Sequence, residues 1–367
     1  MKIECVKEKL LHAVSKIERI ATKNAALPIL SCLLFEVKNN NLKIKATNMD
    51  IGVEAIIPVK VTEEGVVAVL GSVFVNLISN IQNEKSVILE TIDSNLQIKT
   101  DYGKTVIKSH PSDDFPTIPK VSDDLLSFDL DSKKLIKGLK SVIFSSSLSN
   151  VKPELSSVYI YTNEDNVFFA AADSFRLAEK KINLKHNNNF FNVLIPAKNI
   201  PDIIRIFEDV DGDINIHLSK NQISFSYGYN YLVSRVVDGI FPDYKQLIPN
   251  EFKTEVVVLK QDLLSALKIS NIFTDKFNKI SLKIEPSNKV FEMMTKNSDI
   301  GESTNIISAG LSGEDVLINF NYKYIVDCLP LIDSDSISLS FNGVSKPLVI
   351  RGGSDKSFTY IVMPMNK

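Results

Sequence analysis

The stretch KIECVKEKLLHAVSKIERIA, Lys2–Ala21, sets the pattern for the whole chain. It begins with a short alternating segment, Lys2–Val6, which predicts a strand, and continues as an amphipathic helix from Lys7. The apolar residues of this helix are spaced by four, three and four positions, so they form one buried stripe. They are Leu10, Val14, Ile17 and Ala21.

The same strand and helix recur twice, with strands beginning at Leu126 and Thr254 and helices at Ser132 and Lys260. Each repeat then continues with a hairpin, a second helix and further alternating strands. Runs rich in Val, Ile, Tyr and Phe between Asn, Asp and Ser turns are typical of such hairpins. The second helices are expected at Ser72–Ile81, Lys198–Phe207 and Asn321–Ile332.

Proline-containing joints separate the repeats. They are FPTIP, Phe115–Pro119, and FPDYKQLIP, Phe241–Pro249, and proline favours a linker because it cannot continue a strand ladder. We therefore predict an α+β fold of three repeated domains, each with two helices packed on antiparallel sheet. The expected domains are residues 1–120, 127–246 and 252–367. The alternatives are three unrelated α+β domains or one large irregular domain.

The bulk composition excludes several classes of protein. The three cysteines are odd in number and far apart, which argues against a disulfide framework or a zinc site and fits a reducing cytoplasm. The first residues already carry lysine and glutamate, so they do not form the apolar core of a signal peptide. No apolar run approaches the length that spans a bilayer. We expect a cytoplasmic protein.

Positive charge gathers on the expected helices, although the formal net charge of the chain is −2. In the first helix the cationic side chains step by three, four, three and four residues, and in the first helix of the second repeat by four and three, so each set shares a face. Two further cations, seven apart, share a face on the next helix. The helix cations are Lys9, His12, Lys16, Arg19, Lys23, Lys133, Lys137, Lys140, Lys198 and Arg205.

A solvated helix face usually mixes positive and negative side chains, because like charges four residues apart repel. An unbroken basic stripe in a chain of net charge −2 therefore predicts that the acidic residues lie elsewhere. Such helices, lining one surface, would bind phosphates without reading bases. No aromatic residue is interleaved with these cations, so stacking of single-stranded bases is not favoured. The alternative for any single helix is an ordinary solvated face. The third repeat is weaker, with Lys260, Lys268 and Lys323.

No motif for catalysis or metal binding stands out. The chain has no phosphate-binding glycine loop, no HExxH and no GxSxG, and its four histidines are scattered. Asp209, Asp211 and Asp213 resemble a calcium loop, but Lys220 stands where that loop needs glutamate, so a turn between helix and strand is favoured. A hydrolase or transferase would need a pair of titratable groups in a cleft, and the sequence offers none. We expect no catalytic residue and no metal or cofactor.

Six segments in order carry a family resemblance over the whole length of the chain. They are LPIL (Leu27–Leu30), ATNMDIGVEA (from Ala46), AADSFRLA (from Ala171), LIPAK (from Leu194), VDGIFPDYKQLIP (from Val237) and YIVMPM (Tyr360–Met365). The chain resembles the beta subunit of bacterial DNA polymerase III, the sliding clamp. The resemblance implies a head-to-tail homodimer that closes as a ring around duplex DNA and confers processivity on the polymerase. A separate ATP-using loader would open the ring.

The resemblance also implies a cleft that receives a short, mostly apolar peptide from the polymerase, the clamp loader, and other polymerases and repair factors. The matching positions are Leu155, Ser174, Phe175, Arg176, Leu177, Pro242, Gln246, Leu247, Val344, Val362, Met363, Pro364 and Met365. Ser174-Phe175 and Gln246 depart from the family pattern, where Gly-His and a basic residue are usual. For the terminal segment, the alternative is a plain edge strand.

The last implied features are the contacts to DNA and between subunits. Lys198 matches a DNA-facing lysine of the family. Ile272 and Phe273 are implied at the ring interface, with Ile107 as the counterpart on the other subunit. The alternative for these three is an ordinary core position. A different alternative for the whole chain is a monomeric scaffold that uses the peptide cleft without encircling DNA.

Overall fold

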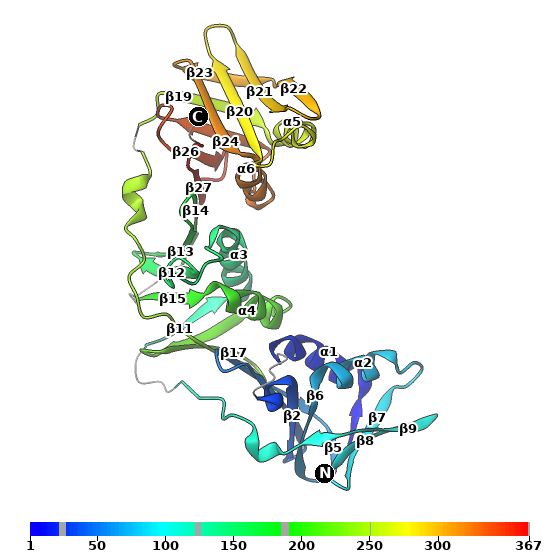
Figure 1. Ribbon diagram of the computed structural model, residues 1–367. Coiled ribbons are helices and arrows are strands. Elements are labelled where there is room, and N and C mark those ends of the chain that lie inside the picture. Colours follow the sequence, from blue (N-terminus) through cyan, green and yellow to red (C-terminus); the bar gives the residue numbers. More distant parts are fainter. Residues whose placement is uncertain (22–26, 122–125, 185–190, 250, 366–367) are drawn as a thin grey trace. The chain divides into compact units, whose positions relative to one another are not determined.

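The computed structural model describes residues 1–21, 27–121, 126–184, 191–249 and 251–365 (Figure 1). The chain divides into two compact units. The first unit contains residues 1–136 and 198–236, and the second contains residues 137–197 and 237–367. Helices and antiparallel sheets make up both units, which confirms the predicted α+β class.

Two sheets form the first unit. One has the order β5-β1-β7-β8-β9 and the other β10-β6-β2-β3-β4-β18-β17-β16-β11. The second sheet joins the first two repeats through β4 and β18, where Ala55 lies opposite Asn230. The strands are β1 Lys2–Val6, β2 Cys32–Lys38, β3 Asn41–Thr47, β4 Ile51–Pro58, β5 Lys60–Glu63, β6 Gly65–Leu70, β7 Ser86–Ile92, β8 Asn95–Thr100, β9 Gly103–Ile107, β10 Ser109–His110, β11 Leu126–Asp131, β16 Asp213–Leu218, β17 Gln222–Tyr227 and β18 Asn230–Arg235.

The helices of the first unit are α1 Lys7–Ile17, α2 Gly71–Asn80 and α4 Ile200–Phe207. Helix α1 packs against α2, α4 and β4 through its apolar stripe, because Leu10, Val14 and Ile17 are buried as predicted. The stripe ends earlier than expected, since the chain tightens into a 3-10 turn, Glu18–Ile20, and Ala21 lies beyond it. Further 3-10 turns are Pro28–Ser31, Ser112–Asp114 and Ala197–Asn199.

The second unit also contains two sheets, with the orders β15-β12-β13-β14-β27-β26-β25-β19-β23 and β22-β21-β20-β24. Its larger sheet joins the second and third repeats through β14 and β27, where Leu177 lies opposite Ile361. The strands are β12 Ser157–Asn163, β13 Asn166–Ala172, β14 Arg176–Asn183, β15 Asn192–Pro196, β19 Thr254–Leu259, β20 Lys279–Glu285, β21 Val290–Asn297, β22 Gly301–Ile306, β23 Ala309–Gly313, β24 Val316–Asn321, β25 Ser336–Phe341, β26 Leu348–Gly352 and β27 Phe358–Val362.

Helices α5 Lys260–Ile272 and α6 Tyr322–Cys328 belong to the second unit, and α3 Ser132–Val142 begins in the first unit and continues in the second. Gly138 of α3 has a packing role, because a Cβ there would lie 2.4 Å from the ring of Phe169. Three 3-10 turns complete the elements, Ile143–Ser145, Tyr244–Leu247 and Leu329–Leu331. None of the described helices is long and apolar enough to cross a membrane.

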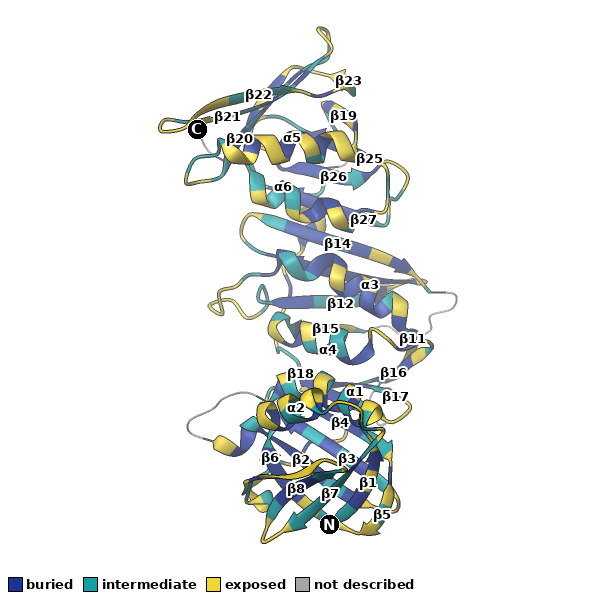
Figure 2. Cartoon of the chain, turned by 90° about the vertical axis from the view of Figure 1, so that its right-hand side faces the viewer, coloured by how far each residue is buried: buried dark blue, intermediate teal, exposed yellow. Residues whose placement is uncertain are grey.

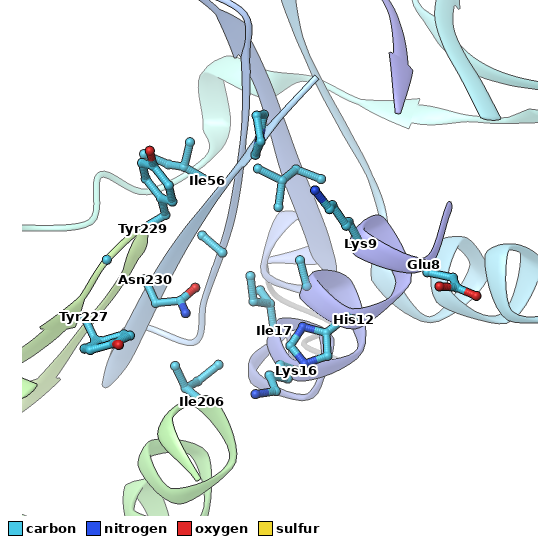
Figure 3. Close-up of a pocket in the computed structure, with 15 residues that line it drawn as sticks. Glu8, Lys9, His12, Lys16, Ile17, Ile56, Ile206, Tyr227, Tyr229 and Asn230 are labelled. Atoms are coloured by element: carbon cyan, nitrogen blue, oxygen red, sulfur yellow. The ribbon is translucent and has the colours of Figure 1, made fainter. Parts of the chain in front are cut away.

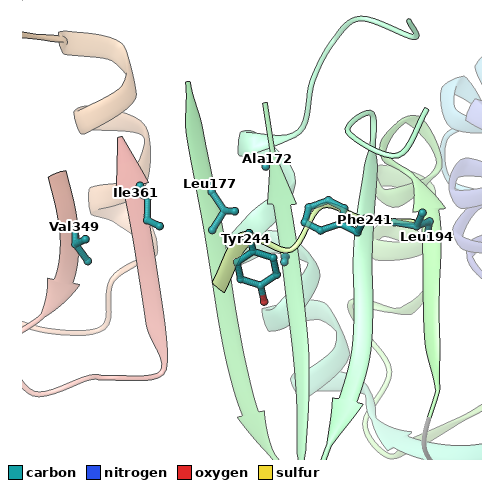
Figure 4. Packing of buried hydrophobic residues seen from close by; sticks show 8 residues of the cluster. Ala172, Leu177, Leu194, Phe241, Tyr244, Val349 and Ile361 are labelled. Carbon is teal, nitrogen blue, oxygen red and sulfur yellow. The ribbon is translucent and has the colours of Figure 1, made fainter. Parts of the chain in front are cut away.

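Burial varies across the sheets: the interior strands β13 and β27 are wholly buried, the edge strands β5, β9, β22 and β23 are largely exposed, and the helices alternate buried and exposed residues (Figure 2). The joints between repeats are more than linkers. Phe241 and Tyr244 of the second joint are buried in a cluster with Leu177, Leu194 and strands of the larger sheet (Figure 4). In the first joint Ile118 is buried, and the Tyr231 hydroxyl donates to the Pro119 carbonyl at 3.0 Å. Both joints therefore contribute to the cores beside them.

Candidate functional site

Of the cations expected on the first helix, Lys9, His12 and Lys16 lie on α1, whereas Arg19 lies in the 3-10 turn that follows it. Lys9, His12 and Arg19 are exposed, and Lys16 is half-buried. Figure 3 shows Lys9, His12 and Lys16 around one cavity. Lys23 lies outside the described residues.

An acidic side chain accompanies this face of α1. The Lys16 ammonium lies 3.0 Å from the Asp209 carboxylate, and His12 Nε2 lies 3.9 Å from the same oxygen. The hydrogen bond from Lys16 lowers the pKa of Asp209, so the carboxylate is ionised at neutral pH. Arg205 of α4 is compensated too, because it pairs with Asp202 and donates to the Lys16 carbonyl at 2.9 Å.

The remaining pairs repeat this arrangement, each with an aspartate from another element. Their nitrogen–oxygen distances are 2.7 Å for Lys133 with Asp211, 2.5 Å for Lys137 with Asp333, and 2.5 Å for Lys198 with Asp50. The expectation that the acidic residues lie elsewhere is wrong at these positions, because the fold brings aspartates from other elements into contact with these lysines.

These ion pairs are open to solvent. In the pair of Lys133 and Asp211 the side chains are 73% and 86% exposed. Exposed pairs contribute little to stability and are screened by salt. A phosphate that approaches such a lysine can therefore replace the aspartate at small cost.

The segment AADSFRLA forms a tight turn that fixes Arg176 at the start of β14. The Asp173 carboxylate accepts hydrogen bonds from the backbone N–H groups of Phe175 and Arg176, at 2.7 and 2.9 Å. The Arg176 guanidinium then binds Asp173 at 3.1 Å and Asp327 at 2.8 Å, and it lies 4.7 Å from the ring centre of Tyr324. Burial lowers the pKa of Arg176, but Tyr360 and the two aspartates outweigh burial and raise it. Arg176 is a fixed anchor with its charge compensated.

The positions implied for peptide binding divide into a buried, a half-buried and an exposed group. Leu177 and Val362 are buried on the neighbouring strands β14 and β27, and partly buried Leu155 packs against the cluster that contains Leu177. Arg176, Pro364 and Met365 are half-buried. The exposed positions are Ser174, Phe175, Pro242, Gln246, Leu247, Val344 and Met363.

The terminal segment is tied to this region by its backbone. The Met363 N–H donates to the Phe175 carbonyl at 2.8 Å, which continues the pairing of β14 with β27. The alternative of a plain edge strand is wrong, because β27 lies between β14 and β26. Phe175 and Met363 are therefore exposed apolar side chains next in sequence to the strands that bury Leu177 and Val362.

The three positions implied at the ring interface differ in exposure. Ile272 is 62% exposed at the end of α5, and Phe273 is half-buried. Ile107 is only 6% exposed, whereas its neighbour Val106 is 54% exposed on the edge strand β9. In this chain Val106, which the sequence reading missed, offers the larger apolar surface at that edge.

Comparison with known proteins covers the chain from end to end. Residues 1–119, 129–243 and 245–366 match the family models for the N-terminal, central and C-terminal domains of the DNA polymerase III beta subunit. The chain belongs to this family. Family membership confirms the resemblance and the predicted function, a sliding clamp for DNA polymerase III with DNA and the polymerase as its partners. The family is a non-catalytic processivity factor, so the hydrolase and transferase alternatives are wrong.

Individual beta subunits resemble the chain over nearly their full length. The beta sliding clamp of Synechococcus elongatus is 27% identical over 372 residues, which cover 100% of this chain and 99% of the relative. The beta sliding clamp of Staphylococcus epidermidis is 27% identical over 92% of both chains. The crystal structure of the Thermotoga maritima beta subunit matches with a TM-score of 0.94 at 27% identity, covering 100% of this chain and 99% of that one. The Bacillus subtilis clamp supports the fold alone, with a TM-score of 0.94 at 23% identity and the same coverage.

The sequence reading missed the aspartates that accompany the helix cations. Asp209, Asp211 and Asp213 were expected in a turn between helix and strand, which is confirmed for Asp209 and Asp211 and wrong for Asp213, because Asp213 is the first residue of β16. Their second role, as counterions of Lys16 and Lys133, depends on strands and helices far apart in the sequence. A turn rich in aspartate directly after a helix was the only signal that could have indicated it.

Proposed function

We propose that this beta subunit closes as a head-to-tail homodimeric ring around duplex DNA and holds the polymerase by topology, in the cytoplasm. The observation that carries the proposal is the solvent-exposed pairing of Lys133, Lys137 and Lys198 with aspartates. A ring needs no tight grip, because closure prevents escape, and exchangeable phosphate contacts permit sliding. The helix cations are the proposed contacts to DNA.

Three domains per subunit, residues 1–120, 127–246 and 252–367, would give a dimer six similar domains. The proposal is supported by the three consecutive family matches, which begin and end near these bounds. A head-to-tail contact of this kind uses two different surfaces and closes only if the rotation per subunit completes a circle.

We place the two surfaces of the ring contact at the free sheet edges. Strand β9 is the edge of one sheet and carries exposed Val106, and strand β22 is the edge of another. Unpaired edges are templates for strand addition. Ile272 supplies exposed apolar area, with half-buried Phe273 next to it in the chain. Ile107, at the end of β9, is buried and would not form the contact surface itself.

The partner site would receive a short, mostly apolar peptide beside the cluster that contains Leu177. Exposed Phe175, Leu247, Val344 and Met363 support this placement, because unpaired apolar side chains gain most from being covered. Polymerase, clamp loader and other repair factors would compete for it.

Retention on nicked circular DNA after loading, measured before and after the circle is linearised, tests the proposal. Loss only on linearisation means topological linkage. Equal retention on both forms means ordinary affinity and overturns the ring. No retention on either form with an active loader, together with a monomeric mass in solution, favours the scaffold alternative.

A further inference from the structure

A second candidate site lies in the first unit, at the junction of the first two repeats. An open cavity of about 550 Å³ is lined by α1, the end of β4, α4 and the turn between β17 and β18 (Figure 3). Its lining is largely apolar, and its volume falls in the range of small-ligand sites. The apolar residues are Ala13, Ile17, Ala55, Ile56, Ile57, Pro58 and Ile206.

Two tyrosines from the turn between β17 and β18 form one side of this cavity. Tyr229 is 67% exposed, and no hydrogen bond of its hydroxyl is found among the described residues. Tyr227 is held in place, because its hydroxyl donates to the Asp211 carbonyl at 2.9 Å. Gly228 has a φ of +55°, which suits this two-residue turn. The Ile56 N–H donates to the Tyr229 carbonyl at 3.1 Å and ties the turn to β4.

The fold thereby removes the ground on which one expectation from the sequence rested. Stacking of single-stranded bases was not favoured, because no aromatic residue is interleaved with the cations of α1. Tyr227 and Tyr229 are more than two hundred residues away in the chain, yet they line the same cavity as Lys9, His12 and Lys16. Figure 3 shows Tyr229 and Lys9 on opposite sides of it.

The charges around the cavity favour an anion. Three cationic or protonatable side chains line it, Lys9, His12 and Lys16, against one carboxylate, Glu8. Asp209 engages Lys16 and His12, whereas Lys9 is exposed and has no ion pair within the described part of the chain. Asn230 adds an amide that can both donate and accept hydrogen bonds.

We propose that this cavity binds one unpaired nucleotide of single-stranded DNA, with the base against Tyr229 and the phosphate toward Lys9 and His12. An aromatic face beside cations is the usual means of holding single strands without reading their sequence. A base within a duplex cannot enter without leaving its stack. The proposal goes beyond tethering on duplex DNA, and because every lining residue belongs to one chain it does not depend on ring closure.

A short fluorescent oligodeoxythymidine, titrated with the full-length protein at low salt, measures this binding by anisotropy. Tyr229→Ala should weaken binding by about fivefold or more, the range found when a stacking aromatic residue is removed. Tyr229→Phe keeps the ring and should remain within about twofold of the parent. Tyr102→Ala removes a tyrosine that is 82% exposed outside the cavity and serves as the matched control.

A crosslinking measurement keeps the proposal testable if a variant folds poorly. An oligonucleotide carrying 5-iododeoxyuridine should crosslink, on irradiation, to the peptide that contains Tyr227 and Tyr229. Crosslinks confined to other peptides, or equal losses of affinity in Tyr229→Ala and Tyr102→Ala, overturn the proposal. So does binding of an acidic peptide in the cavity without any binding of the oligonucleotide. Both measurements work without a loader or circular DNA, so failure of the ring leaves their outcome readable.

Discussion

Two groups of cationic side chains in this molecule are held in opposite ways. Lys133 and Lys137 on α3 each face one aspartate, and both partners of each pair are largely exposed. The side chains of Arg176 and Lys180 on β14 are mostly buried instead. Lys180 is only 2% exposed and binds Asp355 at 3.1 Å and the Ser357 hydroxyl at 2.6 Å.

Because they differ in burial, the two groups of ion pairs have different roles. An exposed pair exchanges partners easily, as a surface that slides along phosphates requires. A buried charge that loses its partner has no water to replace it, so the pair fixes the geometry around it. In this chain the pair of Lys180 and Asp355 links β14 to the turn before β27.

Replacement of the buried lysine, Lys180→Met, should have the largest effect on stability. It leaves Asp355 without its cation, and breaking one side of a buried pair costs about 3–5 kcal/mol. Thermal denaturation should show a clear fall in Tm. Lys181→Met, at the exposed neighbouring position, is the control and should stay within about 0.5 kcal/mol of the parent. Equal falls in the two variants would remove the distinction between the groups.

Reversal of two exposed charges, Lys137→Glu with Lys140→Glu, should leave Tm nearly unchanged and act on DNA instead. Loss of two phosphate contacts should reduce the slope of log affinity against log salt by about two on linear duplex DNA, and shorten retention on circles. The control is Lys253→Glu with Lys346→Glu, which reverses two exposed lysines away from the helices. Retention that is the same in both double variants would exclude α3 from the DNA surface.

Removal of one counterion should raise the affinity for duplex DNA, by less than the charge reversal on α3 lowers it. Asp209→Asn frees Lys16 and His12, so duplex affinity at low salt should rise by about two- to threefold, with a salt slope steeper by at most about one. Asp213→Asn, at the start of β16, makes an equal change of net charge without touching this ion pair. An equal gain in both variants would show that net charge alone is responsible. Filter binding over a salt series measures it.

The sequence predicted the elements well because each has its own periodicity. Strands β1 and β19 and the start of α1 lie where alternation and helical spacing put them. The pairing of β4 with β18 and of β14 with β27 could not be predicted in the same way, since it joins one repeat to the next. Local pattern specifies which face of a strand is buried, but not which distant edge it meets.

For the candidate site, too, the sequence predicted the positions within one helix but not the residues that other elements bring to it. Positions on one helix, such as Lys9 and Lys16, follow from the helical period alone. Their partners do not, because Asp209 and Tyr229 arrive from other elements through the tertiary fold. Burial also depends on the tertiary fold. Ile107 was therefore expected at the subunit interface, although it is buried and its neighbour Val106 is exposed.

The pH dependence of stability sharpens the same contrast, with the smallest expected effect. Burial raises the pKa of Asp355, but hydrogen bonds from Ser357 and Lys180 outweigh burial and lower it. A lowered pKa contributes stability that is present above the ordinary aspartate value, about 3.9, and is lost as the pH falls through the folded value. Tm of the parent should therefore fall below about pH 4 more steeply than Tm of Asp355→Asn.

High salt then distinguishes this carboxylate from Asp209, which is 65% exposed and whose pKa the half-buried Lys16 lowers in the same direction. At about 1 M salt the Debye length is about 3 Å, so the contribution of the exposed pair should vanish while that of the partly buried pair persists. The difference in acid sensitivity between the parent and Asp355→Asn should survive the salt, and the corresponding difference for Asp209→Asn should not. If both differences disappear, Lys180 and Asp355 are as accessible to solvent as the helix cations, and the division into fixed and exchangeable pairs fails.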